Sequence, residues 1–131
     1  MAGRPAACDT YPYFTGFANE TGTGKGLGYN RNYPLPPDTN DELYIRTFGK
    51  ALDYIARHKV DVLVVSLGFD IIKGDPTGTF HVGPAALGAM GRLLIQAGVP
   101  LLIVQEGGYS IRNIKRGSRA FFSSCAEAEH L

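Results

Sequence analysis

Apolar residues recur at helical spacing near the middle of the chain and then give way to an almost continuous apolar run. The recurring positions predict a helix over about residues 40–58, and they are Tyr44, Phe48, Ala51, Leu52 and Ile55. Thr39 and Glu42 have the spacing of a capping box at the start of this helix. Residues 60–67 (VDVLVVSL) are rich in β-branched residues, which is typical of a parallel strand covered on both faces.

The pattern continues with a second helix, a second strand and a third helix. Pro84 stands at a first helical position and Gly98 just past the end, which is the usual asymmetry of a helix. Residues 99–105 (VPLLIVQ) predict another buried strand, and Ser110 is placed to cap a helix over about 111–122. Alternation with short connections predicts right-handed βαβ units, and therefore an α/β fold with a parallel sheet.

The two ends of the chain show less pattern. Residues 1–10 have no periodicity and residues 123–131 are polar, so both are expected to be tails. Residues 11–40 are rich in glycine and proline, and only Tyr29–Leu35 is a candidate strand. A loop of this length is unusual in a compact domain, which indicates that it is functional or that neighbouring structure is missing.

Composition narrows the class of protein. The chain has 131 residues, enough for one domain at most. Its 13 Lys and Arg against 12 Asp and Glu leave a net charge of +1, so charge alone favours neither nucleic acid nor an anionic membrane as partner. No apolar run approaches the roughly 20 residues of a membrane helix. Two cysteines, no CxxC pair and no evident secretory signal favour a reduced, cytoplasmic protein.

Two side chains with catalytic chemistry follow the two predicted strands. Asp70 comes three residues after the first strand, and Tyr109 comes four residues after the second. Ligands bind beyond the carboxyl ends of parallel strands, so this carboxylate and this phenol are expected at one rim of the sheet. Taken singly, Asp70 also fits a turn acid and Tyr109 a packed aromatic residue.

The same segments resemble a known family. SLGFDIIKGDPTGTF (66–80) and LLIVQEGGY (101–109) look like the C-terminal part of the histone deacetylase superfamily, and they are most similar to its bacterial acetylpolyamine amidohydrolases. Upstream, YPYFTGFANETGTGKGLGYNRNYPLPPDTNDELY (11–44) resembles the family segment that precedes the next helix. The resemblance covers about Tyr11 to Phe122.

This resemblance implies a fold and a chemistry. The fold is a three-layer α/β/α sandwich of arginase/deacetylase type with a mainly parallel sheet, of which this chain would hold the C-terminal half. The chemistry is zinc-dependent hydrolysis of acetylated amines. Asp70 matches a zinc ligand, Tyr109 the oxyanion-stabilising tyrosine, Gly107 and Gly108 the glycines of the substrate channel, and Asp75 a structural acid. The region of Tyr29 resembles a segment that helps to hold a structural monovalent cation.

The sequence also departs from the family pattern. It has no D-x-H motif and no adjacent histidine pair, and its histidines are His58, His81 and His130. Two of the family's three zinc ligands and its general base are therefore absent. His81 follows Asp70 in the same loop and is the remaining candidate for a second ligand. Zinc is expected to be weakly held or absent.

Three interpretations follow. The chain is a truncated deacetylase domain of about three strands with little or no activity alone. Alternatively, it is a binding module that forms a homo-oligomer or binds a complementary chain through a bare sheet edge and an apolar face. In the third, a complementary chain restores the site in trans, and only then is an acetylated amine a substrate.

Overall fold

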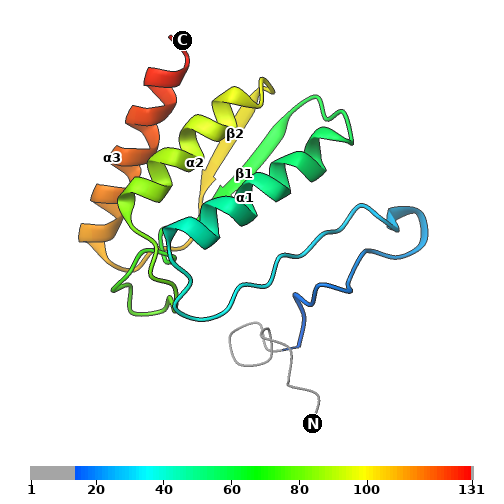
Figure 1. Cartoon of the computed structure of the whole chain (residues 1–131), viewed down its shortest axis with the longest axis horizontal. Coiled ribbons are helices and arrows are strands. Elements are labelled where there is room, and N and C mark those ends of the chain that lie inside the picture. The colour runs from blue at the N-terminus through cyan, green and yellow to red at the C-terminus, as the bar shows by residue number, and fades with distance from the viewer. Residues whose placement is uncertain (1–13, 131) are drawn as a thin grey trace. The chain divides into compact units, whose positions relative to one another are not determined.

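The computed structural model in Figure 1 describes residues 14–130 of the chain. The chain divides into two compact units, residues 1–37 and 38–131. No helix among the residues described is long and apolar enough to span a membrane.

The described part of the first unit is an irregular loop organised by one carboxylate. Oε2 of Glu20 accepts hydrogen bonds from the backbone N–H of Gly16 (2.7 Å) and Phe17 (3.0 Å) and from Nδ2 of Asn32 (2.9 Å). The one regular element described here is the short 3-10 helix η2 (Gly24–Gly26). The expected strand at Tyr29–Leu35 does not form, and its proline removes a donor that a sheet ladder would need.

The second unit alternates helices with two parallel strands. Its elements, in chain order, are α1 (Asp41–Ala56), β1 (Leu63–Leu67), α2 (Pro84–Gln96), β2 (Leu101–Gln105) and α3 (Ile111–Ala128). The strands pair in parallel along their whole length, with Leu63 opposite Leu101 and Leu67 opposite Gln105. The predicted α/β order is confirmed, although the described sheet has two strands where about three were expected.

The helix starts follow the sequence signals with one exception. Pro84 is the first residue of α2, and the Ser110 hydroxyl accepts a hydrogen bond from the backbone N–H of Asn113 (3.4 Å) at the start of α3. The capping box predicted for α1 is wrong. Oδ1 of Asn40 caps that helix by accepting from the backbone N–H of Leu43 (3.1 Å), and the Thr39 side chain is buried instead.

Helix α3 is longer than the sequence pattern predicted. It continues past Phe122 to Ala128, with Ser124 buried and Cys125 half-buried in these last turns. Phe121 is fully buried, and the Ser124 hydroxyl accepts a hydrogen bond from Nη1 of Arg92 on α2 (3.0 Å). This segment is mostly polar, so the few residues that pack against α2 do not stand out in the sequence.

The core lies on one face of the sheet. Leu63, Val65, Leu101 and Ile103 point toward the buried cluster that α2 and α3 help to form. The alternate positions carry apolar side chains that stay exposed, at 55% for Val62, 58% for Val64, 55% for Leu102 and 40% for Val104. The sequence predicted strands covered on both faces, but the part of the chain that is described covers only one. These four side chains form the open sheet face.

Helices α2 and α3 lie side by side and approach closely (Figure 1). A Cβ atom added at Gly91 on α2 would lie 2.6 Å from the backbone oxygen of Phe121 on α3. It would also lie 2.9 Å from Sγ of Cys125. Only glycine permits this contact without moving a helix backbone.

Replacing Gly91 with alanine is expected to destabilise the fold. The added methyl group overpacks a helix–helix contact, which costs about 1–3 kcal/mol of unfolding free energy. Gly49→Ala is the matched control, because a Cβ there meets no atom within 4 Å in the middle of α1. That control should gain roughly 0.5–1 kcal/mol from helix propensity. Urea unfolding of both variants checks the difference, and equal effects would contradict the close approach.

Candidate active site

The loops that follow the two strands are joined by backbone hydrogen bonds. The N–H of Phe69 donates to the carbonyl of Gly107 (2.8 Å), and the N–H of Glu106 donates to the carbonyl of Leu67 (3.0 Å). These bonds extend the parallel pairing beyond the strand ends. The loops that carry Asp70 and Tyr109 therefore lie together at the carboxyl rim of the sheet, as the sequence predicted.

Asp70 lies against the second loop. Its carboxylate lies next to Gly68 and Gly107, and a side chain at Gly107 would occupy the place of the carboxylate oxygens. Asp70 itself is half-buried. The structure thus brings together two of the candidate residues and gives Gly107 a physical reason to be glycine.

Gly108 and Tyr109 form the outer part of the same rim. Gly108 has φ of +133°, and a Cβ there would lie 3.0 Å from Cβ of Phe69, so the turn requires glycine. The turn leaves the Tyr109 side chain 63% exposed. The exposed phenol can offer its hydroxyl group to a ligand at this rim.

Asp75 fixes the backbone beneath Tyr109. Its carboxylate is buried, with the residue 6% exposed. Oδ2 accepts from the backbone N–H of Tyr109 (2.8 Å) and Ser110 (3.2 Å), while Oδ1 accepts from the N–H (3.0 Å) and hydroxyl (2.9 Å) of Thr77. Burial raises the pKa of this carboxyl, but the four hydrogen bonds outweigh burial and hold the pKa below its ordinary value.

Tyr44 joins the site from α1, although its sequence position suggested only an apolar helix face. Burial raises the pKa of its phenol, and the negative charge of Asp70 raises it further. Its ring also packs edge-on against Phe80, with centroids 6.1 Å apart. The electrostatic effect of Asp70 on Tyr44 was missed because helical periodicity shows which residues face inward but not which charges they meet.

The residues described do not make a zinc site by themselves. Zinc takes at least three protein ligands. Among residues 14–130, no three His, Cys, Asp or Glu side chains are grouped so that they could hold a metal ion. The alternative ligand His81 pairs with Asp38 instead, with Nε2 3.2 Å from Oδ1. Asp70 is thus a single carboxylate with the right chemistry and an incomplete donor set.

Tyr29 belongs to the first unit, where its side chain is 73% exposed and its backbone N–H donates to the carbonyl of Gly26 (3.0 Å). Its role beside a monovalent cation stays a prediction.

Asp75→Asn is expected to lower stability by about 3 kcal/mol at neutral pH, because an amide cannot accept all four hydrogen bonds. The folded pKa of Asp75 is depressed, so its contribution is fully present above the ordinary pKa of 3.8. It is lost as pH falls through the lower folded value. The variant should therefore lose part of the acid dependence of unfolding below about pH 4. Asp53→Asn, on the exposed side of α1, is the control. Parallel pH profiles for wild type and Asp75→Asn would contradict this account.

Comparison with known proteins supports the resemblance seen in the sequence. Residues 6–125 match the histone deacetylase domain family. The acetylpolyamine amidohydrolase of Burkholderia pseudomallei is 39% identical over 112 residues, and that of Mycoplana ramosa is 38% identical over 114 residues. The crystal structure of the Burkholderia pseudomallei acetylpolyamine aminohydrolase superposes with a TM-score of 0.88 over 92% of this chain, at 36% identity. The histone deacetylase Clr3 superposes with a TM-score of 0.86 over 95% of the chain, at 31% identity.

These relatives are much longer than the chain. The alignments cover 86% of this chain but 33% of the Burkholderia pseudomallei sequence, and 87% of this chain but 33% of the Mycoplana ramosa sequence. The superpositions likewise cover 35% of the Burkholderia pseudomallei structure and 22% of Clr3. The family match nevertheless spans most of the chain, which therefore belongs to the histone deacetylase domain family.

Proposed function

We propose that this chain supplies two of the loops of a zinc-dependent amidohydrolase site and has little or no such activity alone. The observation that carries the proposal is the joining of the two loops, in which Phe69 bonds to Gly107 and the Asp70 carboxylate lies against that glycine. This places one metal-type ligand and one exposed phenol on the same rim. Family membership supports assigning them the roles of metal ligand and oxyanion donor.

Each residue has a definite task in this proposal. Asp70 contributes one anionic oxygen ligand to the metal. Tyr109 donates its hydroxyl hydrogen to the oxygen of the substrate carbonyl as negative charge develops there. Asp75 accepts a hydrogen bond from the backbone N–H of Tyr109. This bond fixes the backbone from which the phenol side chain extends. The remaining ligands and the general base have no counterpart in the D-x-H or paired-histidine form in this sequence.

The names of the relatives support a proposal for the substrate class. Two of the most similar proteins are named acetylpolyamine amidohydrolases. We therefore propose an acetylated amine as the substrate of the completed site.

The open sheet face supports a proposal for how the site is completed. Val62, Val64, Leu102 and Val104 are 40% to 58% exposed on one face of a parallel sheet, whereas parallel sheets are normally covered on both faces. In the described sheet each strand also has an unpaired edge, and such edges accept further strands. We propose that this surface binds the polypeptide that carries the rest of a deacetylase domain, since this chain spans only about a third of its relatives.

Mixing the full chain with the part of the Burkholderia pseudomallei relative that it does not cover tests the proposed activity and the proposed binding surface. With zinc and an acetylated polyamine, the chain alone should give no turnover above a protein-free control, and the mixture should hydrolyse the substrate. Tyr109→Phe should reduce the activity of the mixture by roughly 100-fold or more without weakening association, because it removes one oxyanion donor. Asp70→Asn should also lower activity while leaving association intact.

Val64→Lys combined with Leu102→Lys should abolish association, measured by light scattering, while Leu27→Lys at another exposed apolar position should not. Robust turnover by the chain alone would overturn the first proposal. A stable homodimer that excludes the second polypeptide would overturn the choice of partner.

A further inference from the structure

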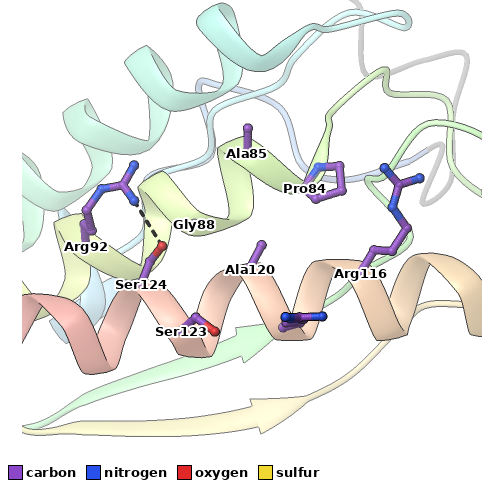
Figure 2. A pocket seen from close by; sticks show the side chains of 9 residues that line it. Pro84, Ala85, Gly88, Arg92, Arg116, Ala120, Ser123 and Ser124 are labelled. Atoms are coloured by element: carbon purple, nitrogen blue, oxygen red, sulfur yellow. Dashed lines mark hydrogen bonds between the residues drawn. The ribbon is translucent and has the colours of Figure 1, made fainter.

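A groove lined by three arginines lies between α2 and α3 (Figure 2). It has a volume of about 490 Å³. Small residues, among them Ala85, Gly88 and Ala120, make up part of its lining, together with Arg92, Arg116 and Arg119. We call it the arginine groove. Neither Asp70 nor Tyr109 lines it, so it is separate from the candidate active site.

No carboxylate among the lining residues neutralises the positive charge of the groove. No aspartate or glutamate is among its lining residues. Within residues 14–130 the three guanidinium groups form no ion pair with a carboxylate. Arg92 donates one hydrogen bond, from Nη1 to the Ser124 hydroxyl (3.0 Å), which orients the group while leaving its other donors available. The groove therefore presents oriented cations with unused donors.

The placement of these charges on α3 is also unfavourable for the helix alone. The first turn of α3 has no acidic residue, although the amino end of a helix favours negative charge. Arg112, Lys115, Arg116 and Arg119 instead place four cations in the first half of the helix. Arg112 and Arg116 are four residues apart and Arg116 and Arg119 three, spacings at which like charges repel. An anion bound over this stretch would relieve both effects.

We propose that the arginine groove binds a small molecule that carries a chain of phosphate groups. Guanidinium forks match phosphate oxygens in pairs, and the hydroxyls of Ser123 and Ser124 on the same lining are further donors. Arg116 lies eight positions before Ser124, the partner of Arg92, which is about 12 Å along the helix axis. A chain of phosphates can contact more of these spaced donors than a single phosphate can.

Calorimetric titration of the full chain with inorganic tripolyphosphate tests the proposal. The chain should bind tripolyphosphate more tightly than inorganic phosphate, and Arg116→Gln with Arg119→Gln should weaken binding by roughly tenfold or more. Arg116→Lys with Arg119→Lys keeps the charge but loses the fork, and should fall between the two. Arg46→Gln with Arg57→Gln is the control, because it removes the same charge from exposed positions of α1 and its carboxyl end.

Circular dichroism of each variant checks that it remains folded. A parallel titration with ATP distinguishes the source of the phosphate chain. Equal affinity for ATP and tripolyphosphate means that the phosphates alone are bound, and tighter binding of ATP means that the ligand is a nucleotide. The proposal is overturned if tripolyphosphate does not bind at low salt, if the α1 control weakens binding equally, or if an oligoglutamate peptide binds as tightly.

Discussion

The parallel pairing of β1 with β2 is the constraint on which the rest of the structure depends. Because the strands run in the same direction and in register, both chain segments leave the sheet at the same rim. Backbone hydrogen bonds continue the pairing into the two loops, and the Asp70 carboxylate fills the space that the missing side chain of Gly107 leaves. Asp75 then links the first loop to the backbone of Tyr109. The loops that carry Asp70 and Tyr109, far apart in sequence, are thereby held together at one rim of the sheet.

The same pairing leaves one face of the sheet uncovered among residues 14–130. Two strands offer two faces, and the described helices bury only one of them. The other face keeps its apolar side chains exposed, in a chain that spans about a third of its relatives. The candidate site shows the same division. Its rim is well fixed by hydrogen bonds, yet within residues 14–130 it has too few ligands for a metal ion. Within residues 14–130, an uncovered sheet face thus goes together with an incomplete set of metal ligands.

Much of the second unit could be predicted from the sequence because its signals are local. Helical spacing, the proline at the start of α2 and the Ser110 cap each depend on a few neighbouring residues. The errors arose where distant contacts decide. Helix α3 was predicted too short because the contact of Ser124 with Arg92 on α2 leaves no local signal. The open sheet face was not predicted because an apolar run does not reveal which covering elements are present. The shared rim of the Asp70 and Tyr109 loops followed from parallel topology. The effect of the Asp70 charge on Tyr44 did not, because no local pattern links a helix to a loop.

Residue-resolved hydrogen exchange of the full chain tests the central claim most directly, since it reads the joining of the two loops without requiring activity. The amides of Phe69, Glu106 and Tyr109 donate to Gly107, Leu67 and Asp75. They should exchange as slowly as amides within β1 and β2, and far more slowly than that of the exposed loop residue Lys59. If these three amides exchange as fast as Lys59 while the strands stay protected, the loops are not joined. The carboxylate and the phenol would then not share a rim.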